Sequence, residues 1–182
     1  GRLGDGSYKV KGDLAHFPFA NAAEGDFRIA GRVTGATLDF LPGPQNEAGG
    51  PAAPGVVWPV LSDIDADLLF ERASMTITAQ RGRAYGARIE QAIARIPNLG
   101  HEPTLAVKGE LAGQLCELLL YANASPVSGW IGGITEGAEA QGNARLDLGL
   151  LIPLSHAADT KVNGVIAFQN NNLTLPGIPP FT

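Results

Sequence analysis

Apolar and polar residues alternate most regularly in the stretch 58–99. Within it, three segments place apolar side chains on one parity and polar or charged side chains on the other. Because a strand sends successive side chains to opposite faces, each segment is predicted to be a strand with one apolar and one polar face. The apolar residues of the three segments are Ile64, Ala66, Leu68 and Phe70, then Met75, Ile77 and Ala79, and last Tyr85, Ala87, Ile89 and Ile93.

The same alternation continues on both sides of this stretch. Residues 34–35 are interpreted as a turn that joins two strands in a hairpin, with a β-bulge as the alternative, and 170–171 as a turn before the last strand. The pattern predicts about nine strands in an antiparallel meander. Besides the three central segments, the strands are expected near 8–14, 26–34, 37–40, 104–113, 143–152, 161–169 and 173–175.

The period of the pattern changes after residue 114. Apolar residues then follow the i, i+3, i+4, i+7 spacing of a short amphipathic helix. They are Leu115, Leu118, Leu119 and Ala122. Ser125 and Pro126 next supply a capping residue and a first helical position, so a second helical turn is predicted. We therefore expect one or two short helices at about 114–135.

The chain is predicted to form a single β-rich domain over 1–182. A length of 182 residues favours one domain, and 45% hydrophobic residues is typical of a globular chain. The segment 41–55 is rich in proline and glycine, which prevents a helix or a sheet ladder there. Because strands of the same kind flank this segment, it is interpreted as an exposed loop within the domain.

An apolar face built from this many strands has to be covered. Strands lie about 4.8 Å apart, so about nine of them form a surface on the order of 40 Å wide. Soluble monomers rarely leave so large an apolar surface bare. A sandwich, a trough capped by the helices, or a groove that holds an apolar ligand would each cover it. The alternation is the same in all three, so it leaves them open.

Composition and motifs argue against several classes of function. The net charge of -5 and the lack of a basic cluster argue against nucleic acid, whose binding depends on Lys and Arg. A single cysteine allows neither a disulfide framework nor a zinc site built from cysteines. Residues 63–67 begin like a calcium loop, but Leu68 and Ser74 stand where glycine and glutamate are required. No catalytic residue, metal site or cofactor is predicted, and we do not expect an enzyme.

The order of short motifs along the chain resembles that of a known family. The motifs are Leu38-Asp39-Phe40, Trp58-Pro59-Val60-Leu61-Ser62-Asp63-Ile64, Leu69-Phe70-Glu71-Arg72-Ala73-Ser74-Met75-Thr76-Ile77, Tyr85-Gly86-Ala87-Arg88-Ile89, Ala94-Arg95-Ile96-Pro97-Asn98-Leu99, Leu105-Ala106-Val107-Lys108-Gly109, Ala124-Ser125-Pro126-Val127, Gly142, and Leu150-Leu151-Ile152-Pro153-Leu154. Their order and spacing, from about 27 to 175, are similar to those of the YhdP branch of the AsmA-like proteins, relatives of TamB in the Gram-negative envelope.

This resemblance implies that the chain is an internal segment of a long periplasmic protein. The implied fold is a curved antiparallel β-meander that forms a hydrophobic groove. The implied function is lipid transport, in which phospholipid acyl chains slide along the groove between the inner and outer membranes. Flanking β repeats of the same protein are then partners, and the anchor in the inner membrane would lie outside this chain.

The groove face is predicted to contact lipid through inward-facing apolar residues. These are Ile64, Leu68, Phe70, Met75, Ile77, Ile89, Leu105, Val107, Leu146, Leu148, Ile166 and Phe168. The alternative is a closed β-sandwich that serves as an interaction or structural module of the cell envelope without conducting lipid.

Overall fold

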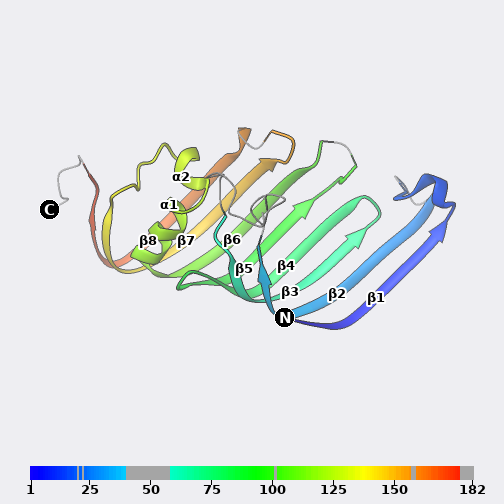
Figure 1. Ribbon diagram of the computed structural model, residues 1–182, viewed down its shortest axis with the longest axis horizontal. Helices are drawn as coiled ribbons and strands as arrows, with labels where there is room; N and C mark the ends of the chain where they lie inside the picture. The colour runs from blue at the N-terminus through cyan, green and yellow to red at the C-terminus, as the bar shows by residue number, and fades with distance from the viewer. Residues whose placement is uncertain (20, 22, 40–57, 101, 157–158, 177–182) are drawn as a thin grey trace, which may run out of the picture.

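The computed structural model describes residues 1–19, 21, 23–39, 58–100, 102–156 and 159–176 (Figure 1). The strands among these residues form one 8-stranded sheet, in which each strand pairs antiparallel with the next one along the chain. The strands are β1 (Arg2–Gly12), β2 (Gly25–Leu38), β3 (Leu61–Glu71), β4 (Ser74–Ala84), β5 (Ala87–Ile96), β6 (Thr104–Gln114), β7 (Glu139–Pro153) and β8 (Lys161–Thr174). The 3₁₀ helix η1 (Leu14–His16) follows β1, and α1 (Leu115–Asn123) and α2 (Val127–Trp130) lie between β6 and β7.

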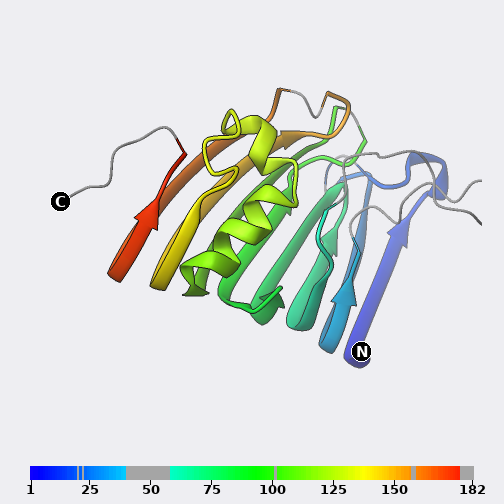
Figure 2. The same cartoon turned by 60° about the vertical axis from the view of Figure 1, so that its left-hand side comes forward.

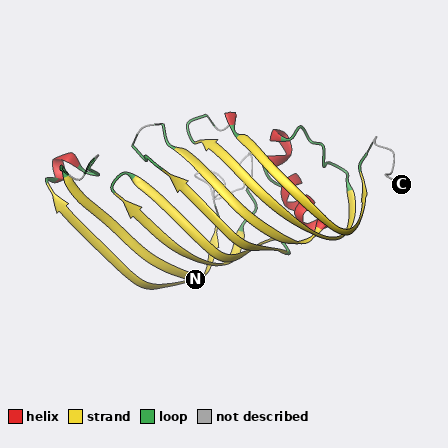
Figure 3. Ribbon diagram, turned by 180° about the vertical axis from the view of Figure 1, so that it is seen from behind, coloured by secondary structure: helices red, strands yellow, loops and turns green. Residues whose placement is uncertain are grey.

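The sheet is curved and does not close on itself, since β1 and β8 stand at opposite ends of the strand order (Figure 1). Both α-helices lie on its concave side (Figure 3), and Figure 2 shows α1 over this side, where it contacts β6 and β7. The predicted fold class, a mainly β curved antiparallel meander with one or two short helices, is confirmed. The loop predicted at 41–55 lies outside the described residues.

Irregularities interrupt most of the ladders. Register shifts occur in the pairs β1–β2, β2–β3, β3–β4, β5–β6 and β7–β8. In β2 the shift lies between Val33 and Ala36, where Gly35 adopts a φ of 57°. Glycine takes this left-handed conformation without a steric cost, and a bulge requires such a residue. The hairpin predicted at 34–35 is therefore wrong, and the alternative bulge is present within one continuous strand.

The carboxylate of Asp65 connects the bulged regions of β2 and β4. Its Oδ1 accepts a hydrogen bond from the amide of Gly35 at 2.8 Å, and its Oδ2 accepts one from Nε of Arg81 at 2.5 Å. These two hydrogen bonds, that from Gly35 first, hold the pKa of Asp65 below its ordinary value. The polar face predicted at 63–67 thus also stabilises the irregular pairing around Asp65.

Two further sequence predictions are wrong because irregularities within strands were not foreseen. Ile93, predicted to share a face with Ile89, pairs with Thr78 and Lys108 on the opposite face, because an extra residue after Ile89 reverses the parity of β5. The turn predicted at 170–171 lies inside β8. The meander therefore has 8 strands rather than about nine.

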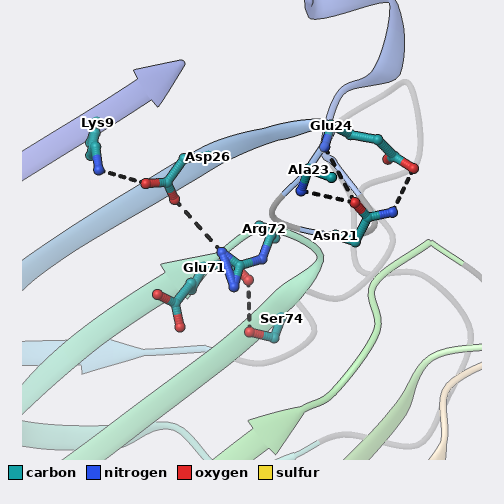
Figure 4. Close-up of polar contacts among 8 residues, drawn as sticks. All are labelled: Lys9, Asn21, Ala23, Glu24, Asp26, Glu71, Arg72 and Ser74. Carbon is teal, nitrogen blue, oxygen red and sulfur yellow. Dashed lines mark hydrogen bonds and ion pairs between the residues drawn. The ribbon is translucent and has the colours of Figure 1, made fainter. Parts of the chain in front are cut away.

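Ion pairs join the strand ends of β1, β2 and β3 (Figure 4). Nζ of Lys9 lies 2.6 Å from one carboxylate oxygen of Asp26, and a guanidinium nitrogen of Arg72 lies 3.7 Å from the other. The hydrogen bond from Lys9 is the main cause that lowers the pKa of Asp26. Oγ of Ser74 donates to the carbonyl of Glu71 at 2.8 Å and closes the turn between β3 and β4.

The connection between β1 and β2 folds over one corner of the sheet. The side chain of Asn21 accepts hydrogen bonds from two following backbone amides at 3.0 and 3.2 Å (Figure 4). Phe19 is fully buried there, with its ring edge-on to that of Phe17. A Cβ on Gly25 would lie 2.6 Å from the Phe19 ring and 2.6 Å from the carbonyl oxygen of Lys11. This corner therefore requires glycine at position 25.

Gly25→Ala is expected to lower the free energy of unfolding by about 1–3 kcal/mol, because the added methyl group overlaps the ring of Phe19 and the backbone. Gly129→Ala is the matched control, since beyond its own helix backbone no heavy atom lies within 4 Å of the position of its Cβ, and it should not lower the free energy of unfolding, because alanine favours a helix more than glycine does. Urea unfolding measures both variants. Equal stabilities would contradict this packing of Phe19.

Asp65→Asn is expected to flatten the dependence of stability on pH in the acid range. The pKa of Asp65 is lower in the folded protein than its ordinary value of 3.8. Its stabilising contribution is therefore present above pH 3.8 and is lost as the pH falls through the lower folded value. Urea unfolding at a series of pH values compares the variant with the wild type. The same slope for both would show that this carboxylate does not stabilise the bulge through its charge.

Candidate functional site

One face of the sheet is apolar from β1 to β8. Paired residues of an antiparallel ladder point to the same side, so the register shows which residues share a face. One row across the strands contains Gly31, Leu68, Ile77, Ala94, Val107, Leu150 and Val162, and another contains Ile89, Leu111, Leu146 and Ile166. We name this side, on which α1 lies, the inner face. Its paired positions in the described strands carry apolar or aromatic residues or glycine.

The residues predicted to contact lipid all lie on the inner face. They are Ile64, Leu68, Phe70, Met75, Ile77, Ile89, Leu105, Val107, Leu146, Leu148, Ile166 and Phe168. Their exposure differs along the sheet. Ile64 and Ile89 are buried, Ile166 and Phe168 are exposed, and the others are half-buried. The structure thus brings the predicted set onto one surface but does not leave all of it bare.

The predicted lipid-contacting set did not include the small residues of the same face. Gly109 pairs with Leu148 and with Ala92, and Gly164 pairs with Leu148 from the other side. Glycine and alanine occur on either side of a strand, so they gave no signal for burial. The parity of the larger neighbours on each strand would have identified them.

The opposite face, which we name the outer face, carries paired charges. Nε of Arg32 donates to Asp67 at 2.7 Å, and the amide of Gln80 donates to the same carboxylate at 2.7 Å. Arg145 lies 3.6 Å from Glu90. Two open hollows of about 730 and 390 Å³ lie along this face between such side chains. Because the apolar residues gather on the other side, the inner face is the candidate functional site.

Helix α1 is seated on the inner face of β4–β7. Its residues have high helix propensity, and it ends before Pro126, since a residue before proline disfavours helical backbone. Leu115, Leu118 and Leu119 are buried against the sheet. The floor beneath them consists of Ala84, Ala87, Ile89, Leu111 and Ala144. Together these residues form the main buried core cluster of the described chain.

Small residues make room for the helix. A Cβ on Gly113 would lie 3.0 Å from Cα of Ala87, so β6 can approach β5 closely there. A Cβ on Gly86 would lie 1.8 Å from Oε1 of Glu117, which places the β4–β5 turn directly against α1. Burial raises the pKa of Tyr121 to about 12, with the neighbouring Tyr85 as a second cause. The small residues of the sheet therefore leave space for α1. We name the floor formed by Ala84, Ala87, Ile89, Leu111 and Ala144 the seat of α1.

Hydrogen bonds close the segment 115–138 onto itself. Nδ2 of Asn123 donates to the carbonyl of Thr135 at 2.9 Å, and the hydroxyl of Thr135 donates back to Oδ1 at 2.6 Å. Oγ of Ser128 donates to Glu136 at 2.9 Å. The predicted capping residue Ser125 accepts from the amide of Val127 at 3.3 Å. We name this unit the α1–α2 segment.

The inner face is exposed at both ends of the sheet and partly covered between them. Tyr8 of β1 is 85% exposed and Ile29 of β2 is 43% exposed. At the other end, Phe168 of β8 is 53% exposed. Near the middle, the ring of Trp130 in α2 lies 5.7 Å from that of Trp58. Two bare apolar stretches are thus separated by the stretch that carries the helix.

Metal sites and membrane-spanning helices are the other features considered for this part of the chain. Among the described residues, no group of three or more His, Cys, Asp or Glu side chains is arranged to hold a metal ion. The helices in that part of the chain are also too short or too polar to cross a membrane.

Leu118→Ala is expected to lower the free energy of unfolding by about 2–5 kcal/mol, because it leaves a cavity between α1 and the sheet. Leu120→Ala is the matched control in the same helix. Leu120 is 55% exposed, so its truncation should change stability by less than about 0.5 kcal/mol. Thermal or urea unfolding measures both. Similar losses for the two variants would contradict the seating of α1 on the inner face.

Comparison with known proteins assigns the family. A family model described as YhdP protein matches residues 1–182. Searches of curated proteins and of solved structures find no match. The family match agrees with the resemblance carried by the short motifs and covers every strand of the sheet. The chain therefore belongs to the YhdP family, within the AsmA-like proteins.

Proposed function

We propose that this chain is a segment of a periplasmic, bridge-like lipid transporter that carries phospholipid between the inner and outer membranes. The observation that carries this proposal is the inner face, which is apolar across all 8 strands and bare at both ends of an unclosed sheet. Exposed apolar surfaces of this extent are typical of binding surfaces. Membership of YhdP, a family of the cell envelope, supports the same proposal.

Acyl chains suit the inner face physically. Each buried methylene group contributes about 0.8 kcal/mol, and contacts between hydrocarbons have no preferred direction. The paired positions of the face offer no charged side chain that would trap a headgroup, so a chain can slide from one strand to the next. The headgroup remains in water at the open side of the sheet. This function requires no catalytic residue and no cofactor.

The two sheet edges provide the junctions with the rest of the protein. An edge strand presents unpaired backbone groups to whatever lies beside it. The strand order ends at β1 and at β8. We therefore assign flanking β repeats of the same protein to both edges, and attachment to the inner membrane to a segment outside this chain.

A closed β-sandwich that docks envelope proteins is the alternative function. It requires a second sheet packed on the inner face. The described strands belong to a single sheet, and the element packed on the inner face is α1. The transporter is therefore the better supported of the two functions.

Ile77→Glu tests lipid binding directly. Ile77 is half-buried on the inner face between Leu68 and Ala94, outside the core cluster under α1. A carboxylate at this position is expected to reduce bound phospholipid strongly, because an ion among acyl chains loses its hydration. Native mass spectrometry of the purified protein measures bound phospholipid, and circular dichroism confirms that the sheet persists.

Thr76→Glu is the matched control for this experiment. Thr76 lies on the outer face and pairs with Arg95, so a carboxylate there faces a cation and water. Phospholipid binding should stay at the wild-type level. Wild-type protein that carries no phospholipid, or equal retention by the two variants, would contradict the proposed function.

A further inference from the structure

The α1–α2 segment lies on the same surface that we propose for acyl chains. Leu115, Leu118 and Leu119 are 1%, 4% and 7% exposed, and they rest on the inner face of β4–β7. Branched hydrocarbon side chains of the protein thus fill the place that lipid would take. Ile89, one of the residues predicted to contact lipid, belongs to the floor beneath these leucines.

The inner face beside the helix is partly covered along the same strands. Ile96 of β5 and Leu150 and Ile152 of β7 are 5%, 7% and 8% exposed, whereas Leu105 and Val107 of β6 between them are half-buried. The row Ile89, Leu111, Leu146 and Ile166 begins beneath α1 and ends at the exposed surface of β8. An acyl chain that follows this row across the sheet meets the α1–α2 segment.

The segment is held together by its own contacts. Its own hydrogen bonds, between Asn123 and Thr135 and between Ser128 and Glu136, hold it together. Its contacts in the core cluster are apolar. Gly132 and Gly137, both with a φ of 70°, lie in the return connection to β7. Lifting α1 from its seat would exchange apolar contacts and leave these hydrogen bonds intact.

We propose that the α1–α2 segment is a gate on the lipid path. In its closed position it covers the seat, and it lifts when an acyl chain takes the place of its leucines there. This inference rests on the proposed function. A ligand can shift such an equilibrium only by binding one state better than the other. The seat meets that condition, because acyl chains reach it only when the helix has left.

A disulfide lock between α1 and the β4–β5 turn tests the gate. A Cβ on Gly86 would lie 2.3 Å from Cδ of Glu117, so Gly86→Cys and Glu117→Cys place two thiols within reach of each other. Cys116→Ser removes the native thiol. A photo-crosslinking amino acid replaces either Ile77, outside the seat, or Ile89, beneath α1. The chain is then mixed with vesicles of phosphatidylethanolamine and phosphatidylglycerol.

Oxidation of the lock is expected to lower lipid crosslinking at position 89 by about tenfold, since it removes the open state, and a reductant should restore it. Crosslinking at position 77 should not change. Equal crosslinking at position 89 in both redox states would overturn the gate. Absence of crosslinking at position 89 in both states, with position 77 labelled, would also overturn it. Absence of crosslinking at both positions would overturn the proposed function instead.

A second measurement leaves the seat unaltered and so does not depend on the fold tolerating a bulky group at position 89. The rate at which the two cysteines oxidise reports how often α1 rests against the turn. Vesicles are expected to slow this oxidation, because acyl chains on the seat displace the helix. The variant with Gly86→Cys and Glu117→Cys in buffer alone is the reference. An oxidation rate that vesicles do not change would overturn the gate.

Discussion

A sheet keeps one face apolar only while its strands stay in register, because a slip of one residue turns every side chain to the other side. In this chain an irregularity within several strands changes which alternate residues face inward. The neighbouring strand changes at the same level, so that inward residues still pair with inward residues. Ala79 and Gly82 of β4 face inward on either side of the irregularity, opposite Ala92 and Ile89 of β5. The inner face is continuous because these reversals are matched between strands. The proposed lipid path depends on that continuity.

Hydrogen bonds on the outer face stabilise the irregular pairing of β2, β3 and β4. Asp65 accepts hydrogen bonds from a bulge residue of β2 and from Arg81 of β4, and neither bond involves the inner face. A charged side chain can therefore stabilise this bulge without placing a polar group on the inner face. This separation explains why the charged residues of the central strands fall on one parity. Their role is to shape the sheet as well as to keep its outer side in water.

The sequence predicted the elements better than their irregularities. Alternation located β3, β4 and β5, and the spacing of leucines located α1, because both signals are local. The bulge at Gly35 was weighed only as an alternative to a turn, and the reversal at Ile93 was missed. A bulge is stabilised by a partner such as Asp65, which lies 30 residues away from Gly35. The alternation within one strand gives no information about a contact between residues so far apart in the sequence.

The alternation of apolar and polar residues also could not predict which element would pack on the inner face. A sandwich, a capped trough and a lipid groove predict the same alternation, and the stripe of α1 does not say which surface it will meet. The seat could have been noticed in the small residues at 84, 87 and 144, which leave depth for a helix that Leu68 or Phe70 would not. The motif order indicated the family, and the match over the whole chain bears that out.

A surface that transports lipid must be apolar and yet must not remain bare when lipid is absent. The α1–α2 segment meets both demands, because its leucines cover the middle of the inner face with the same kind of atoms that lipid would bring. Acyl carbons on the inner face would restore the burial of the residues beneath α1, at about 0.8 kcal/mol for each methylene group. The leucines of the lifted helix would keep their own burial only where they contact hydrocarbon in turn, so the balance between the closed and open states of the proposed gate depends on that contact. The proposed gate would then respond to lipid alone, and it would not by itself give the proposed transport a direction.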